Sequence, residues 1–214
     1  MIMVELNQIS KSYKNKKILD NFSLRIHEGE YVCLSGESGS GKSTLLNIIG
    51  LLEQADEGTV DLCEQLDVKV NSKQARQLLS KKISFLFQNY ALVENQTIGY
   101  NLEIACGQLK FSKREKVQMK RDALEKLKLD FDLKTKIYQL SGGEQQRIAL
   151  ARVLLKDSEL ILADEPTAAL DIKNRDLVLE CLKDLNRKGK TIVMVSHDPY
   201  VINQADRVIY LTNE

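Results

Sequence analysis

Residues 36–43 read Gly-Glu-Ser-Gly-Ser-Gly-Lys-Ser, and this glycine-rich stretch constrains the fold more than any other feature of the chain. A buried-strand pattern over Tyr31 to Leu34 precedes it, and a helical pattern from Lys42 to about Leu52 follows. Glycines allow such a loop to aim several backbone N–H groups at one anion, and the helix adds its positive end. The pattern therefore predicts a loop that binds nucleotide phosphates. The residues expected to contact the nucleotide are Gly36, Glu37, Ser38, Gly39, Ser40, Gly41, Lys42, Ser43 and Thr44.

Two side chains give this loop its chemistry. Lys42 adds a mobile positive charge for the β- and γ-phosphates, and the Ser43 hydroxyl can ligate Mg²⁺. A similar tripeptide occurs at Gly189-Lys190-Thr191, but it lacks the upstream glycine and leads into a strand pattern. We therefore expect an ordinary loop at residues 189–191.

Strand patterns alternate with helical ones along most of the chain. A mostly helical pattern runs from about Thr97 to Lys156, and another from about Lys173 to Arg187. This alternation indicates an α/β fold with a parallel sheet covered on both faces. We expect one domain over residues 1–214, with an inserted all-helical subdomain at about 90–156. The predicted strands are Met3 to Ile9, Ser23 to Ile26, Thr59 to Leu62, Ile83 to Phe87, Leu160 to Ala163, Thr191 to Val195 and Val208 to Leu211.

Composition excludes several other classes of protein. The chain has 31 Lys and Arg against 30 Asp and Glu, and a net charge of +1 argues against a nucleic-acid partner. No apolar run approaches the roughly 20 residues of a membrane-spanning helix, and no secretion signal is visible. The four cysteines lack the short spacings of zinc or redox motifs, so we expect reduced core thiols in a cytosolic protein. They are Cys33, Cys63, Cys106 and Cys181.

A second chemical element follows the apolar strand pattern at residues 160–163. Asp164 and Glu165 come directly after it, at the sheet edge where ligands bind in open α/β folds. Asp164 suits Mg²⁺ coordination, directly or through water. Glu165 points differently because side chains alternate along an extended chain, and it could polarise a water for attack on the γ-phosphate. Phosphoryl transfer needs both a metal site and a positioned water, so the pair complements the loop.

A third element is the run Leu-Ser-Gly-Gly-Glu-Gln-Gln-Arg at residues 140–147. Ser141 is a plausible N-cap for a helix that runs to about Lys156, and Glu144 would complete a capping box. Gly142 and Gly143 cost stability at the start of a helix, which a close backbone approach to an anion would explain. This run resembles the signature motif of ABC ATPases, and it lies between the other two elements in the order of that family. The resemblance covers nearly the whole chain, from Val4 to Leu211.

The resemblance implies a fold, a reaction and further site residues. The fold would be a P-loop NTPase core with an N-terminal antiparallel β subdomain and the helical insert. Ser141, Gly142 and Gly143 would contact the γ-phosphate of ATP held by a second copy. Gln88 resembles the glutamine that senses Mg²⁺ and the membrane partner, and His197 the histidine that faces the γ-phosphate. Two further matches are Tyr13, as the aromatic that stacks on adenine, and Ala169-Leu170-Asp171, as the loop that crosses the dimer interface.

The expected activity is therefore ATP hydrolysis, with ATP and Mg²⁺ bound and with Lys42, Glu165 and His197 as the catalytic residues. The expected partners are a second copy of the chain and an integral-membrane permease, which places the chain on the cytoplasmic face of the membrane. In character the chain resembles the branch that serves macrolide, lipoprotein and bacteriocin or peptide exporters. The chain ends about three residues after its last strand pattern, so we expect no C-terminal regulatory domain.

Other functions within this architecture stay open. A cell-division regulator of the same architecture would act on a membrane partner without moving cargo. ABC ATPases of DNA repair need a long coiled coil between the two nucleotide motifs, which the 121 residues from Ser43 to Asp164 do not provide. A binding module without hydrolysis is disfavoured by Glu165 and His197. The basic segment from Lys110 to Lys136 has a local excess of positive charge, and it is either a solvated helical face or a contact with lipid headgroups or the membrane subunit.

Overall fold

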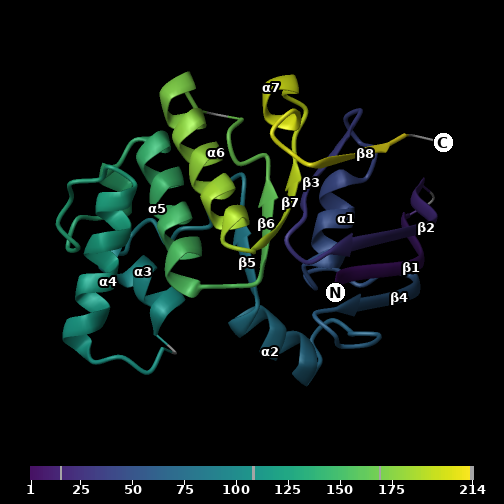
Figure 1. The fold of residues 1–214 in the computed structure, drawn as a ribbon, viewed down its shortest axis with the longest axis horizontal. Helices are drawn as coiled ribbons and strands as arrows, with labels where there is room; N and C mark the ends of the chain where they lie inside the picture. Colours follow the sequence, from purple (N-terminus) through teal and green to yellow (C-terminus); the bar gives the residue numbers. More distant parts are fainter. Residues whose placement is uncertain (15, 108, 169, 213–214) are drawn as a thin grey trace.

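The computed structural model describes residues 1–14, 16–107, 109–168 and 170–212, and within them the strands form two sheets (Figure 1). The smaller sheet is antiparallel and has the strand order β2-β1-β4, with Val4 of β1 between Ile26 and Leu62. It contains the N-terminal part of the chain, as the resemblance implied. Its strands are β1 (Ile2–Tyr13), β2 (Lys16–His27) and β4 (Glu57–Leu62).

The larger sheet is parallel and has the order β5-β6-β7-β3-β8. Its strands are β3 (Tyr31–Gly36), β5 (Ile83–Leu86), β6 (Leu160–Asp164), β7 (Thr191–Val195) and β8 (Arg207–Leu211). Alternate residues of each central strand enter two different hydrophobic clusters: Tyr31 and Cys33 enter one, and Val32 and Leu34 the other. A sheet buried on both faces explains why these strands read as continuous apolar runs. The expected α/β class is confirmed.

Helices cover both faces of the parallel sheet. On one face α1 (Lys42–Ile49) packs through its buried leucines and isoleucines. On the other face α5 (Gly142–Lys156) and α6 (Ile172–Arg187) pack through their own buried hydrophobic residues. Figure 1 shows α3, α4 and α5 together, on the side of the sheet away from the antiparallel strands. A separate helical subdomain at about 90–156 stays a prediction. The remaining helices are α2 (Lys73–Lys81), α3 (Ile98–Cys106), α4 (Lys113–Lys126), the 3₁₀ turn η1 (Ile137–Gln139) and α7 (Pro199–Ile202).

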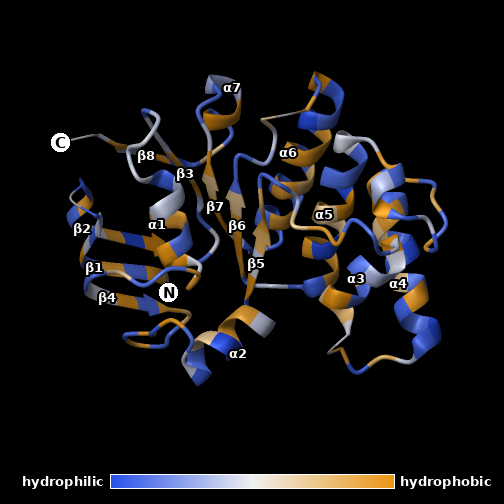
Figure 2. Cartoon of the chain, turned by 180° about the vertical axis from the view of Figure 1, so that it is seen from behind, coloured by the Kyte–Doolittle hydropathy of each residue, from blue (hydrophilic) through white to orange (hydrophobic). Residues whose placement is uncertain are grey.

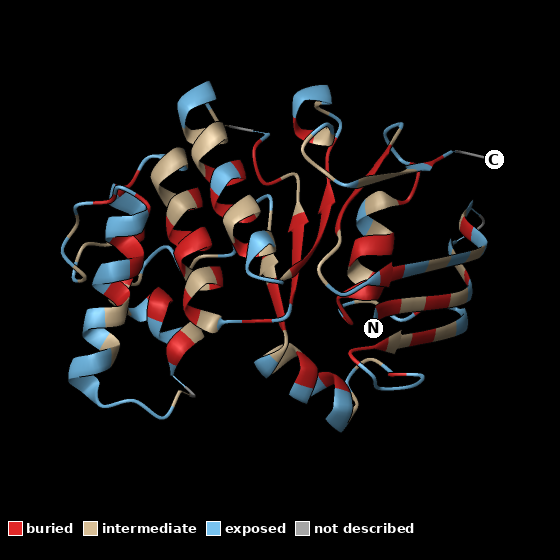
Figure 3. Ribbon diagram, viewed as in Figure 1, coloured by how far each residue is buried: buried red, intermediate tan, exposed pale blue. Residues whose placement is uncertain are grey.

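Hydropathy and burial follow this layering. Hydrophobic residues concentrate on β5, β6 and β7, whereas α4 carries a largely hydrophilic outer surface (Figure 2). The same central strands are buried, and most of α4 is exposed (Figure 3). Part of the positive charge of α4 is neutralised, because Lys116 and Lys120 both pair with Glu103 of α3. The basic excess of this segment is therefore smaller at its surface than in its sequence.

The structure differs from the sequence expectations mainly in the extent of the elements. Strands β1 and β2 are several residues longer than predicted, and α2, capped by Ser72, was not predicted. Helix α1 ends at Ile49 because Gly50 and the left-handed Leu51 follow it. The four cysteines are buried and unpaired, as expected. Within the described residues, no helix is both long and apolar enough to cross a membrane.

Candidate functional site

The glycine-rich loop connects β3 to α1 and depends on glycine at two positions. Gly36 has a φ of 140°, and a Cβ atom there would lie 2.1 Å from the backbone oxygen of Leu211. Gly41 has a φ of 88° and immediately precedes α1, where a Cβ would lie 2.8 Å from Ile18. No side chain caps α1, so the first-turn N–H groups of this helix are available to an anion. The predicted loop between a strand and a helix is present.

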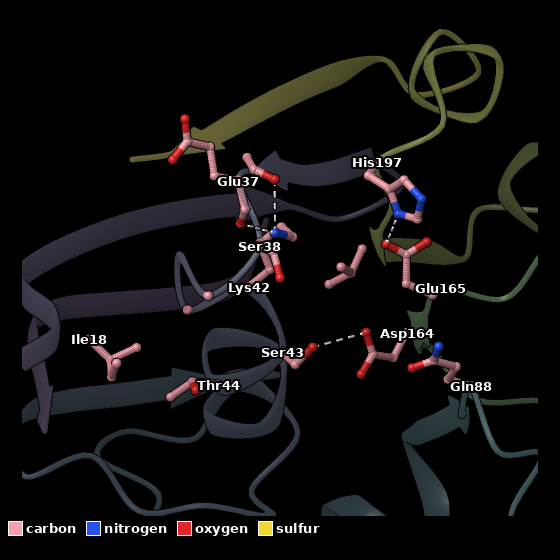
Figure 4. A pocket seen from close by; sticks show the side chains of 14 residues that line it. Ile18, Glu37, Ser38, Lys42, Ser43, Thr44, Gln88, Asp164, Glu165 and His197 are labelled. Atoms are coloured by element: carbon pink, nitrogen blue, oxygen red, sulfur yellow. Dashed lines mark hydrogen bonds and ion pairs between the residues drawn. The ribbon is translucent and has the colours of Figure 1, made fainter. Parts of the chain in front are cut away.

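Lys42 lies at the centre of the loop. Its Nζ donates to the backbone oxygens of Gly36 and Glu37, at 2.9 and 2.6 Å, and lies 3.4 Å from the Ser40 hydroxyl (Figure 4). The loop thus folds around the ammonium group that it would offer to phosphate. Ser40 itself is buried and does not line the cavity described below, so its contact is with Lys42.

Ser43 and Asp164 meet across the site, from the start of α1 and the end of β6. The Ser43 hydroxyl donates to Oδ1 of Asp164 at 3.2 Å. Burial raises the pKa of the Asp164 carboxyl, an effect that the Ser43 hydrogen bond partly offsets. Together with the amide of Gln88, these groups form a set of hard oxygen donors with one carboxylate. Such a set fits Mg²⁺, which usually keeps several waters and binds few protein carboxylates. Among the described residues no group of three His, Cys, Asp or Glu side chains could hold a metal.

Glu165 and His197 form the opposite wall of the site. Glu165 adopts a left-handed φ of 43°, and its backbone N–H donates to Val195 of β7. Its carboxylate is only 14% exposed and its Oε1 lies 2.7 Å from Nδ1 of His197, whose side chain is 72% exposed. The left-handed turn after β6 is a strained conformation for a non-glycine residue, which is typical of functional positions.

These groups surround one cavity of about 760 Å³. The strand order explains their convergence, because β5, β6, β7 and β3 are neighbours and their carboxyl ends share one edge of the sheet. Sequence reasoning missed Ile18 and Val195 as lining residues, since a single apolar residue carries no signal for a cavity. The lining residues are Ile18, Gly36, Glu37, Ser38, Gly39, Gly41, Lys42, Ser43, Thr44, Gln88, Asp164, Glu165, Val195 and His197.

Tyr13 lies beside the cavity and does not line it. It ends β1, and its hydroxyl donates to Oε1 of Glu53. Burial, followed by this contact, raises the pKa of Tyr13, while a hydrogen bond with Thr44 opposes the shift. Because Thr44 does line the cavity, the Tyr13 ring is adjacent to the phosphate loop. The role of Tyr13 in contacting adenine stays a prediction.

The signature-like run lies apart from this cavity. Ser141 caps α5 and forms the predicted capping box, in which its backbone N–H donates to Glu144 at 2.8 Å. Hydrogen bonds from Ser141 lower the pKa of Glu144. Gly142 and Gly143 begin the helix, so their N–H groups have no intrahelical acceptor. None of these three residues lines the cavity of the same copy.

Asp171 is also outside the cavity. It caps α6, and the backbone and side chain of Asn174 donate to its carboxylate, which lowers the Asp171 pKa. Leu170 packs against the core cluster beneath α5 and α6. The predicted interface loop also includes Ala169, which lies outside the described residues.

Known proteins share the sequence pattern and the fold of this chain. The model of the family described as ABC transporter matches residues 19–168. A Bacillus subtilis relative, the uncharacterized ABC transporter ATP-binding protein YvrO, is 42% identical over 98% of this chain and 93% of its own length. The macrolide export ATP-binding/permease protein MacB of Campylobacter jejuni is 43% identical over 97% of this chain. The chain spans only 32% of that longer relative.

The solved structures include a similar fold in a nucleotide-bound state. The ATP-binding cassette MJ0796 is described as a dimer in a post-hydrolysis state bound to ADP and Pi. It is 38% identical in sequence and superposes with a TM-score of 0.90, over 98% of this chain and 94% of the other.

Proposed function

The chain belongs to the ABC transporter family and is an ATPase of that family, and from this premise we propose that two copies close on ATP to drive a separate membrane permease. The observation that supports the proposal is that the cavity of one copy contains only part of the predicted site. One copy presents Lys42, Asp164, Glu165 and His197 around one cavity, while its Ser141 helix start lies outside that cavity. A second copy, placed head to tail, would supply the missing anion-binding helix.

Different residues of one copy would have different roles in the reaction. Lys42 and the amides of residues 36–43 would bind and neutralise the phosphates, because phosphoryl transfer depends mainly on positioning and charge stabilisation. Glu165 would accept a hydrogen bond from the attacking water, and its left-handed backbone fixes where its carboxylate points. His197, at 2.7 Å, holds Glu165 from the exposed side.

Mg²⁺ would be held by Ser43 and Asp164, with Gln88 within reach of the same cavity. When bound, it would neutralise charge on the transferring phosphoryl group. The raised pKa of Asp164 is consistent with such a position, because burial and the nearby charge of Glu165 outweigh the Ser43 hydrogen bond and the attraction of Lys42.

Dimer closure would follow from differential affinity. ATP favours the closed state only if it binds that state more tightly. A γ-phosphate that touches Lys42 of one copy and the α5 start of the other would supply the difference, and ADP would not. Hydrolysis would then release the two copies.

We also propose a location and a direction of transport. The chain would lie on the cytoplasmic face of the membrane and pull on an integral-membrane subunit. Its cargo would be a peptide, bacteriocin, antibiotic or lipoprotein that leaves the cell. The support is similarity to MacB, a relative whose own name describes macrolide export and which joins ATPase and permease in one chain.

The test is the substitution Glu165→Gln. The variant should bind ATP, accumulate as a dimer in light scattering and lose hydrolysis by roughly 10²–10³-fold, because the ordering of the water is lost while the phosphate contacts remain. Glu159→Gln is the matched control, since Glu159 precedes the same strand at the end remote from the cavity and pairs with Lys82. Hydrolysis near the wild-type rate in Glu165→Gln would refute the assignment.

A further inference from the structure

Gln146 joins the helix that begins at the signature-like run to the loop that carries Glu165. It lies five residues after Ser141 on α5 and is only 1% exposed. Its Nε2 donates to the backbone oxygen of Pro166 at 2.6 Å. Pro166 directly follows Glu165, so α5 contacts the backbone of the residue next to the proposed water-orienting residue.

Hydrogen bonds from two different elements restrain the backbone around Glu165. Glu165 leaves the sheet in a left-handed conformation, and its N–H is held by Val195 on the β7 side. The Pro166 oxygen is held by Gln146 on the α5 side. Glu165 is thus fixed between two elements, one from the sheet and one from the helix that begins at Ser141.

The other end of the Gln146 amide argues against a purely packing role. The Pro166 carbonyl can only accept a hydrogen bond, so the NH₂ group must face it and Oε1 must point the other way. Oε1 is buried and has no hydrogen-bond partner among the described residues. An apolar side chain of similar volume would avoid this penalty, so packing alone does not account for glutamine here.

A small cavity lies between these groups. It measures about 10 Å³ and is lined by Gln146, Gln88 and Glu165, with three residues of the loop that follows Glu165 and with Tyr90. Gln88 and Glu165 also line the large cavity. Gln146 therefore stands behind the nucleotide site, at the point where the Gln88 loop, the Glu165 loop and α5 meet.

We propose that Gln146 is a positioning residue that links the α5 start, which would bind the partner copy's nucleotide, to Glu165 of its own copy. This inference rests on the proposed function. Movement of α5 when a second copy docks would reach Glu165 through the Gln146–Pro166 hydrogen bond. Nucleotide bound at one site would then change the position of Glu165 at the other site through the buried Gln146 amide.

The test compares Gln146→Met with Gln145→Met in the full-length chain. Methionine has a similar volume but cannot donate to Pro166. Gln145 is the neighbouring glutamine, and its Nε2 donates instead to the oxygen of Leu140 at 3.0 Å, away from Glu165. The first measurement is amide hydrogen exchange without nucleotide, which does not depend on hydrolysis.

We expect the amides of Glu165, Thr167 and Ala168 to exchange roughly tenfold faster in Gln146→Met and to be unchanged in Gln145→Met. We expect kcat to fall by about 10- to 100-fold while KM for ATP changes less than about threefold, because a displaced base slows chemistry without removing phosphate contacts. If Gln146→Met does not fold, Gln146→Asn, whose amide is too short to reach Pro166, should give the same result.

Unchanged exchange at 165–168, or a kcat equal to that of Gln145→Met, in a folded variant would overturn the proposal. This failure is distinguishable from failure of the proposed function. Near wild-type hydrolysis by Glu165→Gln would remove the role of Glu165, whereas the exchange experiment reports on the Gln146 link itself.

Discussion

Replacing Lys42 by alanine should remove most of the ATP affinity while leaving the fold intact. In the nucleotide-free loop, Nζ makes two short bonds to backbone oxygens and a longer contact with Ser40. A hydrogen bond to a charged group contributes about 1.5–3 kcal/mol net. When phosphate binds, the ammonium exchanges its backbone carbonyl partners for charged phosphate oxygens. Only the difference in free energy between these two sets of hydrogen bonds therefore contributes to the ATP affinity.

We estimate that this difference equals one to two charge-assisted bonds, or about 2–4 kcal/mol. Its loss in Lys42→Ala corresponds to a roughly 30- to 1,000-fold weaker Kd for ATP. The free protein should lose much less. The two carbonyls border an open cavity and can bond to water, so the loss is about 1 kcal/mol or below, and Tm falls by about 2–4 °C for a chain of this size.

The assay is calorimetric titration with a non-hydrolysable ATP analogue, with a thermal scan of each nucleotide-free variant. Lys190→Ala is the matched control, because Lys190 lies in the similar Gly-Lys-Thr tripeptide but donates to Asp157 at 2.7 Å, outside the cavity. Lys190→Ala should retain the wild-type affinity. Equal affinity of Lys42→Ala and wild type would refute the interpretation of residues 36–43 as the phosphate site.

Two further substitutions test the geometry of the site. Gly36→Ala should lower stability by about 2–4 kcal/mol, because the new Cβ meets the Leu211 oxygen at 2.1 Å and the φ of 140° suits only glycine; a thermal scan within 1 °C of wild type would contradict this. Asp164→Asn should raise the Tm of the nucleotide-free protein at pH 7–8. Burial raises the pKa of Asp164, so the ionised carboxylate costs stability as pH rises through that pKa, and the gain should vanish below the usual Asp range of about 3.9. A lower Tm for Asp164→Asn at neutral pH would show that the carboxylate stabilises the fold.

The parts of the site that the sequence predicted share a physical reason. Glycines 36 and 41 adopt backbone conformations that other residues rarely reach, and Asp164 ends a run of buried strand residues. Such features can be predicted from a short stretch of sequence. Ser141 and Glu144 do so as well, because a capping box depends only on residues three positions apart.

The parts that it missed depend on tertiary contacts. Ile18 lines the cavity because β2 passes beside Gly41. The residues around Ile18 contain no pattern that predicts this contact. Strands β1 and β2 extend through a lysine-rich hairpin whose polar residues obscure the alternation. The side chain of Ser40 is buried against Lys42, which the motif alone did not indicate, and its contact with the nucleotide stays a prediction. Order along the chain cannot show which way a loop residue turns.

The exposure of Glu165 and His197, the proposed catalytic pair, bears on when hydrolysis can occur. Glu165 is largely covered, and its N–H is bonded to Val195 while Gln146 bonds to the oxygen of the next residue. In contrast, His197 presents a 72% exposed ring from the end of β7. A base that orients one water needs bulk water excluded, because competing hydrogen bonds would otherwise disorder it. Within the part of one copy that the structure describes, the His197 ring stays exposed at the cavity, and the α5 start carries N–H groups with no intrahelical acceptor. Docking of the α5 start over the cavity of another copy would cover the His197 ring and would place the unbonded N–H groups of α5 at the nucleotide. We therefore expect an isolated copy of the chain to hydrolyse ATP slowly.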